Sequence, residues 1–469
     1  MGQSRREFLR RTSCAALGMA ALQAGIDKFG LMSAFAQRSG VTDYRALVCV
    51  FLDGGNDGNN MIVPLDTAGY ASYASIRSNP GLAIPQASLL PISPRSIGRP
   101  FGFHPGLLEL HALWNQQKLA VVANVGPLSQ PLTQSQYRSG APRPSALFSH
   151  SDQMALWQSP RSDTSSLYGW GGRTGDLTAA FNSGSTFPIV ASIAGQVLFA
   201  VGQSTQPIAL TPAPTPLNQV LVFSGFDASP ESLARRSSFD YLRTIDRHLS
   251  LVAAASSTTQ QAVDAGQALA VDPTLTTVFP ASSLGNQLKQ VAKLIKLNLA
   301  GTQLNLNRQI FFTKIGGFDT HQDQIGNQSF LLGELSTAMS AFYAATVELG
   351  VENRVTTFTL SEFGRTLEPS GSIATVGSDH GWGNHHFVMG GPVLGGDFYG
   401  VPGSNGTVFP SLQLDGPDDA DNRGRWIPTA SVEQYAATLA AWFGVQSSDL
   451  PTIFPLIGRF TTPNLGFLP

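Results

Sequence analysis

Three apolar runs of the sequence each end in a short polar segment rich in glycine, carboxylates or histidine. The runs cover 45–52, 309–315 and 354–360, and each is typical of a strand buried on both faces of a parallel sheet. The carboxylates and the histidine that follow them are Asp53, Asp319, His321 and Glu362. Because ligands of parallel α/β sheets bind beyond the carboxyl ends of the strands, these side chains are expected at one common site.

Histidine sharpens this expectation, because four of the eight histidines lie in the final third of the chain. They are His321, His380, His385 and His386, close in sequence to Asp319 and Asp379. Imidazoles and carboxylates together bind divalent metals, with zinc as the first expectation and calcium, magnesium or manganese as alternatives.

Each of these features also has a structural interpretation. Asp53 followed by two glycines could form only a tight turn, and the segment 319–321 could be a helix-capping loop. In an extended strand His385 and His386 point in opposite directions, so at most one of them would face the site. The clustering of all these residues nevertheless favours a polar or metal site.

The elements needed to position this site follow from the pattern of apolar residues. Strands are predicted at 45–52, 119–125, 309–315, 354–360 and 387–389, and helices at 107–117 and 330–349. The segment from about 175 to 280 has short β-like stretches and Pro/Thr-rich turns, which predict a β-rich insertion or cap. Helices are expected near 230–256, inside this segment, and near 284–300.

The N-terminal segment has the features of an export signal. Residues 4–10 read SRREFLR, an apolar stretch follows at 15–24, and Ala34-Phe35-Ala36 fits a cleavage site. The alternative is an amphipathic helix that carries two arginines. We expect residues 1–36 to be a twin-arginine signal peptide handled by the twin-arginine translocase, and residues 37–469 to form the mature protein. This protein would be periplasmic or secreted, without a membrane span after signal cleavage.

Composition supports a folded, mildly acidic protein. Charged residues make up 13% of the 469 residues and apolar residues 42%, which is unlike a disordered chain. Segment 1–36 holds five basic and two acidic residues, so the mature chain keeps 24 basic and 29 acidic residues. This charge gives no reason to expect nucleic acid as a partner. Cys49 is the one cysteine left after cleavage, so an internal disulfide is excluded.

Several of these motifs resemble a known family. The motifs GGFDTH at 316–321, SEFGRT at 361–366 and SDHGWGNHH at 378–386 resemble the family called domain of unknown function 1501. The segments DGGNDG at 53–58 and LFSHSD at 147–152 fit as well. This family is similar to the alkaline phosphatase and sulfatase superfamily. The resemblance implies an α/β three-layer sandwich with a mostly parallel central sheet, and hydrolysis of phosphate or sulfate esters, usually with two divalent metals.

The resemblance also implies roles for single residues. The implied metal ligands are Asp53, Asp319, His321, Glu362, Asp379, His380 and His386. Ser149 is the candidate nucleophile with Ser145 in reserve, and Arg365 would stabilise charge on the substrate. Phe363 stands where the superfamily has a histidine, which puts one metal subsite in doubt. No Cys-x-Pro-x-Arg motif occurs, so a sulfatase that uses formylglycine is excluded.

Two functions are therefore considered. The first is an exported, metal-dependent hydrolase acting on a small-molecule or glycan ester of phosphate or sulfate. The second is a non-catalytic periplasmic binding or assembly protein that retains the same fold. An oxidoreductase finds no support, because no Gly-x-Gly-x-x-Gly follows a strand and no set of cysteine ligands is present.

Overall fold

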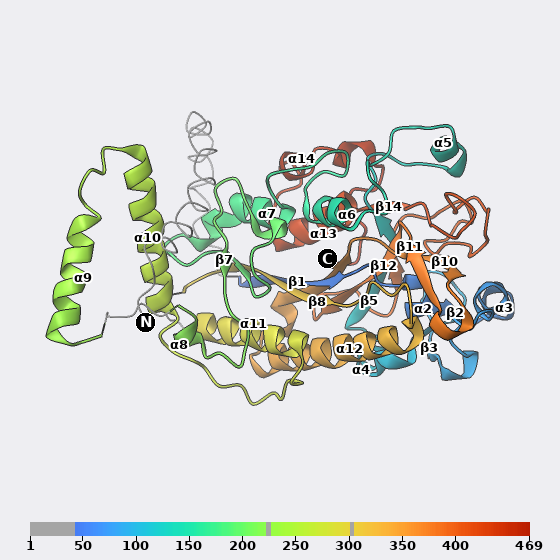
Figure 1. Ribbon diagram of the computed structural model, residues 1–469, viewed down its shortest axis with the longest axis horizontal. Coiled ribbons are helices and arrows are strands. Elements are labelled where there is room, and N and C mark those ends of the chain that lie inside the picture. The colour runs from blue at the N-terminus through green and yellow to red at the C-terminus, as the bar shows by residue number, and fades with distance from the viewer. Residues whose placement is uncertain (1–42, 222–226, 301–303) are drawn as a thin grey trace.

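The computed structural model describes residues 43–221, 227–300 and 304–469. The predicted export signal at 1–36 therefore lies outside the described residues. The chain enters the fold directly at the first strand of a central sheet (Figure 1).

Within the described residues, nine strands form the central sheet. In spatial order they are β13 (Phe398–Tyr399), β5 (Leu119–Gly126), β12 (Asn384–Gly390), β9 (Val355–Ser361), β1 (Arg45–Asp53), β8 (Arg308–Gly316), β6 (Val190–Ser192) and β7 (Ile208–Ala209), with β14 (Ala430–Ser431) beside β5. Strand β12 runs antiparallel to β5 and β9, and the other pairs are parallel. The predicted, mostly parallel sheet is therefore confirmed.

Strand β1 shows why a continuous apolar run forms the middle of this sheet. Successive side chains of a strand point to opposite faces. Val48, Val50 and Leu52 enter one hydrophobic core, whereas Cys49 and Phe51 enter the other. Both faces must be covered by helices, and an alternating polar pattern would leave polar groups buried.

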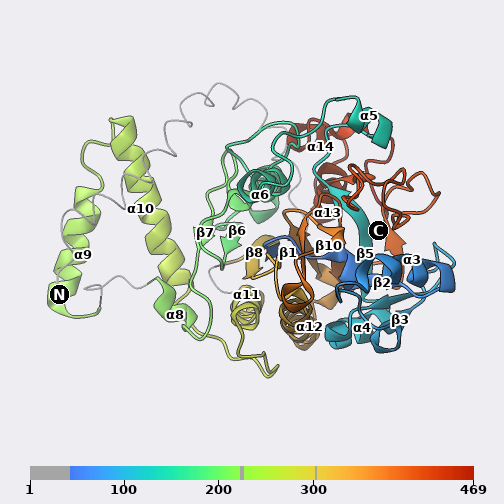
Figure 2. The ribbon, with the colours of Figure 1, turned by 45° about the vertical axis from the view of Figure 1, so that its right-hand side comes forward.

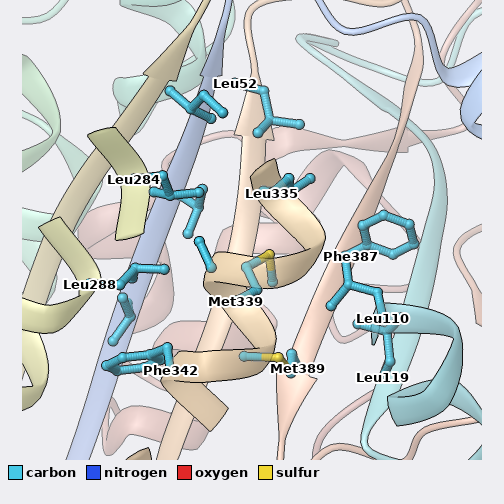
Figure 3. Packing of buried hydrophobic residues seen from close by; sticks show 14 of the residues in the cluster. Leu52, Leu110, Leu119, Leu284, Leu288, Leu335, Met339, Phe342, Phe387 and Met389 are labelled. Carbon is cyan, nitrogen blue, oxygen red and sulfur yellow. The ribbon is translucent and has the colours of Figure 1, made fainter. Parts of the chain in front are cut away.

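Helices cover the two faces of the sheet, which gives the predicted three-layer sandwich (Figure 1). One layer contains α4 (Leu108–Asn115), α11 (Ser283–Leu299) and α12 (Gln324–Glu348). The other contains α6 (His150–Gln158), α7 (Trp170–Thr178), α13 (Val432–Phe443) and α14 (Leu450–Ile453). Figure 3 shows Leu284 and Leu288 of α11 beside Leu335 and Met339 of α12, all packed on the strands.

Helix α12 begins at Gln324, six residues before the predicted start. By length and composition it could cross a membrane, and half of its most apolar window is buried inside the protein. Leu335, Ala338 and Phe342 belong to the hydrophobic core that packs on the sheet. This packing accounts for the apolar character of the helix.

The region from 175 to 280 differs from the predicted β-rich insertion. Its two short strands, β6 and β7, extend the central sheet, and α8 (Leu217–Val220) follows the proline-rich turn. The helix expected at 230–256 is two helices, α9 (Pro230–Leu242) and α10 (Ser250–Ala268), and Asp246 between them has a left-handed φ of 55°. They form a hairpin that projects from the sandwich (Figure 2). Leu210 still donates to Ser192 of β6 at 2.9 Å, and the prolines that begin at Pro212 prevent the ladder from continuing further.

Small elements complete the edge of the sheet near the predicted site. A three-stranded sheet contains β2 (Ile62–Pro64), β4 (Phe101–Phe103) and β3 (Leu90–Ile92), and α2 (Gly58–Met61), α3 (Thr67–Arg77) and α5 (Gln134–Arg138) lie in the connections. A second small sheet pairs β10 (Arg365–Ser370) with β11 (Gly377–His380), which places Arg365 directly opposite His380.

Candidate metal centre

The loops that follow β1, β8 and β9 meet at one edge of the central sheet. Strand β1 pairs in parallel with both neighbours, with Asp53 opposite Gly316 and Leu52 opposite Ser361. The loop after β1 also touches the loop after β8. A side chain at Gly54 would place its Cβ 2.3 Å from the backbone nitrogen of Asp319, and Gly54 has a φ of 117°. Only glycine allows this close approach.

Three histidines surround the carboxylate of Asp319 at this edge. His150 is the first residue of α6, His321 follows β8, and His380 ends β11. Oδ1 of Asp319 lies 3.1 Å from Nε2 of His321 and 3.5 Å from Nε2 of both His150 and His380. Nε2 of His321 is also 2.9 Å from Nε2 of His380. We call these four residues the histidine–aspartate cluster.

The other ring nitrogen of each histidine faces an oxygen acceptor. The acceptors are Glu362 Oε1 at 3.0 Å from His150, Asp379 Oδ1 at 3.2 Å from His321, and Phe148 O at 2.6 Å from His380. Carbonyl and carboxylate oxygens accept, so Nδ1 of each ring donates. With a proton on Nδ1, Nε2 is the nitrogen of each ring that is left to bind a metal, which is the arrangement of metal-binding histidines.

Four of the six separations among the donor atoms suit one small cation. Ligand atoms at 2.0–2.1 Å from a tetrahedral zinc ion are about 3.3 Å apart, and these four separations, of 2.9 to 3.5 Å, bracket this value. The donor atoms of His150, Asp319 and His380 all lie within 4.8 Å of one another. Two facing Nε2 lone pairs at 2.9 Å repel each other, and a cation or a shared proton would remove that repulsion.

Charges around Asp319 keep it ionised. Burial raises the pKa of its carboxyl, but the hydrogen bond and the charge of Arg365, with His321 and His150, hold the pKa below its ordinary value. Burial lowers the pKa of His380, assisted by Arg365 and the neighbouring histidines. A carboxylate and neutral imidazoles are the protonation states that metal binding requires.

Glu362 orients the ring of His150 through a hydrogen bond. It is fully buried, and its Oε1 accepts hydrogen bonds from Gly54 N at 2.7 Å and His150 Nδ1 at 3.0 Å. Burial raises the pKa of Glu362 despite these hydrogen bonds. Its Oε2 is buried without a hydrogen-bond partner among the described residues. Glu362 therefore orients a histidine of the cluster.

Asp379 has the corresponding role for His321. It also pairs with Arg423 at 2.8 Å. Burial raises the pKa of Asp379, and Arg423 and His321 outweigh this and lower it. Asp379 therefore orients a histidine as an ionised carboxylate.

A family comparison supports the resemblance of the sequence motifs. The model of a family described as protein of unknown function (DUF1501) matches residues 44–408, which include every residue of the histidine–aspartate cluster. The chain belongs to the DUF1501 family. No curated protein sequence matches this DUF1501 chain.

Solved structures similar to this DUF1501 protein include two from bacteria. One is described under metabolism of multiple glycosaminoglycans by Bacteroides thetaiotaomicron, with 10% identity over 87% of this chain and 74% of that one, and a TM-score of 0.32. The other is the sulfatase PsFucS1 from Pseudoalteromonas sp., with 12% identity, 81% and 68% coverage, and a TM-score of 0.28.

A third similar structure is a mutant of the alkaline phosphatase PafA. The match has 10% identity and a TM-score of 0.22, and it covers 70% of this chain and 64% of the PafA chain. The fold assignment of this DUF1501 protein rests on the sheet and the helices described above.

The two adjacent histidines of the third motif lie away from the cluster, which corrects the prediction for His386. Strand β12 begins at Asn384, three residues before the predicted start, so both histidines lie inside the sheet. The ring of His386 packs at 4.7 Å from Trp157, and that of His385 stacks on Phe409 at 4.6 Å. Burial lowers the pKa of each to about 3. Both are core histidines.

Arg365 occupies a different position from the one its predicted role requires. Its side chain is fully buried, and its guanidinium donates to the carbonyls of Gly55 at 2.9 Å, Ser378 at 3.0 Å and Phe318 at 3.2 Å, and also to the carbonyl of Gly54. It also pairs with Asp319 at 2.5 Å. These contacts hold the loops together and engage all three nitrogens of the guanidinium with the protein.

Ser149 lies beside the cluster in the chain, but its hydroxyl faces elsewhere. It donates to Asp152 Oδ2 at 2.5 Å, within the first turn of α6. Of its two neighbours in the chain, Phe148 accepts a hydrogen bond from His380 through its carbonyl, and His150 is itself part of the cluster. The reserve candidate Ser145 is exposed in the preceding loop.

Asp53 also lies outside the cluster. Its Oδ2 accepts from Lys314 Nζ at 2.9 Å. Sequence reasoning missed Lys314 and, above all, His150, although His150 directly follows the candidate nucleophile Ser149. The available signal was a histidine at the start of a helix, where it can reach over the edge of the sheet.

Proposed function

We propose that this DUF1501 protein is an exported, metal-dependent hydrolase of phosphate or sulfate esters. The observation that carries the proposal is the convergence of three Nε2 atoms on Asp319 Oδ1 while each Nδ1 is held by an oxygen. Such a donor set suits a bound cation better than a packing role, because the Nε2 lone pairs of His321 and His380 face each other with no hydrogen-bond donor between them.

Zinc is the ion that we propose. Three imidazole nitrogens and one carboxylate oxygen favour zinc over calcium, magnesium or manganese, which prefer sites made largely of oxygen. When bound, the ion would supply Lewis-acid polarisation of an ester oxygen. The side chains of Asp319 and His321 are 48% and 42% exposed, so a substrate can reach the cluster.

The protein's own residues provide orientation and a route for a proton. Glu362, Asp379 and Phe148 O fix the histidine rings, and Arg365 fixes the loop of Asp319. Ser149 remains our candidate nucleophile, and the acceptor of its hydrogen bond, Asp152 Oδ2, would take its proton. Ser149 Oγ would bond to the phosphorus or sulfur while the bond to the ester oxygen breaks, and the departing alcohol oxygen would receive that proton.

The sequence supports export of the folded protein. The SRREFLR segment at 4–10 favours recognition by the twin-arginine translocase, which would place the mature chain in the periplasm or outside the cell. The substrate would then be a small molecule or a glycan ester available in that compartment.

A second function is favoured by a specific observation. The donors of Arg365 contact the protein, and the hydroxyl of Ser149 faces Asp152 rather than the histidines. A non-catalytic periplasmic binding or assembly protein with a metal centre is consistent with both contacts.

Elemental analysis and ester panels test the proposal. Purified mature protein is expected to hold zinc, and Asp319→Ala to lose it together with hydrolysis of phosphate and sulfate esters. Asp240→Ala is the matched control, because Asp240 pairs with Arg243 on the projecting hairpin.

Three outcomes of this test can be told apart. Metal-free wild-type protein that hydrolyses no ester would overturn the proposal. Zinc without hydrolysis across the panel would select the binding function. Hydrolysis that survives in Ser149→Ala would exclude this serine as the nucleophile.

A further inference from the structure

The surroundings of Asp53 bear on how many metals this site holds. The superfamily that the motifs resemble usually has two, and the resemblance would place the second beside Asp53 and Glu362. Gly54, the residue after Asp53, donates its backbone N–H to Glu362 Oε1 at 2.7 Å, so the two carboxylates belong to the same corner of the site. A carboxylate at this point needs a compensating cation.

A lysine already supplies a positive charge at this point. Lys314 lies on β8 opposite Phe51, and Asp53 follows Phe51 by two residues, so both side chains rise on the same face of the sheet. Nζ of Lys314 is 2.9 Å from Oδ2 of Asp53, and the two side chains are 43% and 28% exposed. The pair therefore stands at the rim of the site.

The other donors that a second metal would need are absent from this point. Phe363 follows Glu362 where an imidazole would be required, and its ring stacks on His380 at 4.5 Å and packs against His150 at 4.9 Å. A phenyl ring has no lone pair for a metal. Within residues 43–221, 227–300 and 304–469, the one group of potential ligands whose donor atoms all lie within 4.8 Å of one another is His150, Asp319 and His380, and all three belong to the histidine–aspartate cluster.

We propose that the site holds a single metal and that the ammonium group of Lys314 takes the place of the second cation. This proposal rests on the proposed function and adds the composition of its site. Lys314 keeps the charge of Asp53 balanced and presents N–H donors to the anionic group of an ester beside the metal. A chelator can remove the metal, but the covalently attached ammonium group stays.

Metal stoichiometry and anion binding test this proposal. Mature protein dialysed with excess zinc is expected to hold one zinc per chain by elemental analysis, and Asp53→Asn is expected to hold one as well. Titration of the zinc-loaded protein with inorganic phosphate and sulfate should show about 10- to 100-fold weaker binding by Lys314→Met, the loss of one charged hydrogen bond.

Lys296→Met is the matched control. Lys296 pairs with Glu348 at 3.7 Å and is 37% exposed, so it is a similar surface pair away from the site. It should leave the stoichiometry and the anion affinity unchanged.

The failures of the two proposals can be distinguished. Two zinc ions per chain in an active wild-type protein, with one lost in Asp53→Asn, would overturn the single-metal site and leave the hydrolase intact. No bound zinc and no hydrolysis would overturn both. Unchanged anion affinity in Lys314→Met, at one zinc per chain, would overturn the role of the lysine.

Discussion

Two groups of histidines, one at the edge of the sheet and one inside it, have opposite surroundings. In the histidine–aspartate cluster each ring donates from Nδ1 to an oxygen and directs Nε2 at Asp319. On β12, His385 and His386 are enclosed instead, and aromatic rings cover both of them. Nε2 of His386 is buried with no hydrogen-bond partner among the described residues.

This contrast shows that the residue type alone does not identify a metal ligand. His380 and His386 are six positions apart in one motif, yet only His380 has both an acceptor for Nδ1 and a carboxylate near Nε2. His386 is uncharged because burial lowers its pKa to about 3, and it serves as a packing group. What lies near Nε2 therefore distinguishes a metal-ligand candidate from a packing histidine: the Asp319 carboxylate for His380, and no hydrogen-bond partner among the described residues for His386.

The largest expected effect is the loss of metal from the cluster. Because structural zinc sites bind with roughly 10–16 kcal/mol, one of four ligands contributes about 3 kcal/mol or more, so His380→Ala should bind zinc over ~100-fold more weakly. His386→Gln should keep the metal, because His386 lies outside the cluster. Competition with a chromogenic zinc chelator measures both affinities, and similar losses in both variants would break the comparison.

A smaller effect is expected for the residue that orients His150. Glu362→Gln keeps an acceptor for Nδ1 but removes the buried charge, so zinc affinity should fall about tenfold, the low end for groups that support metal ligands. The same titration applies, with Glu231→Gln on the exposed start of α9 as control. An affinity equal to that of the wild type would show that Glu362 only packs beneath the site.

The smallest effect concerns the stability of the metal-free protein in acid. Burial lowers the pKa of His386 from its ordinary value of 6.5 to about 3 in the folded state, so between these pH values only the unfolded chain binds the extra proton. Stability is therefore complete above pH 6.5 and falls as the pH drops toward 3, by ~1.4 kcal/mol per pH unit for one proton. His386→Gln should reduce this slope by that amount.

Urea unfolding of both metal-free proteins between pH 4 and 7 measures the two slopes. Glu433 opposes the histidines in both proteins, because burial raises its pKa to about 7 and the folded state holds its proton. Its contribution cancels in the difference. Equal slopes would mean that His386 is not buried as a neutral ring.

The sequence predicts the scaffold better than the site. Strands β1, β8 and β9 were predicted because both faces of each are buried, which leaves a continuous apolar run. The prediction of Asp319, His321 and His380 at one edge follows from that parallel order. The prediction of a β-rich insertion is wrong because the two short strands of this region, β6 and β7, extend the central sheet, and α8, α9 and α10 occupy much of the rest.

Single site residues depended on contacts that no local pattern contains. His150 meets Glu362, 212 positions later in the chain, only because α6 starts above the end of β9. His386 was misplaced because the start of β12 was predicted three residues late, which moved a core position to the rim. Arg365 was predicted to face the substrate because sequence does not show that four backbone carbonyls surround it.

Because β1 lies in the middle of the sheet, it can pair only after its two neighbouring strands are available. Its neighbours come much later in the chain: Thr313 of β8 bonds Cys49 across 264 positions, and Ser361 of β9 bonds Leu52 across 309. Strand β1 is synthesised before both of its neighbours. This apolar strand therefore stays unpaired until most of the chain has been made. Contacts of such range make folding slow. The cluster joins His150 of α6, the loop after β8 and His380 of β11, so it can form only after these distant segments have come together.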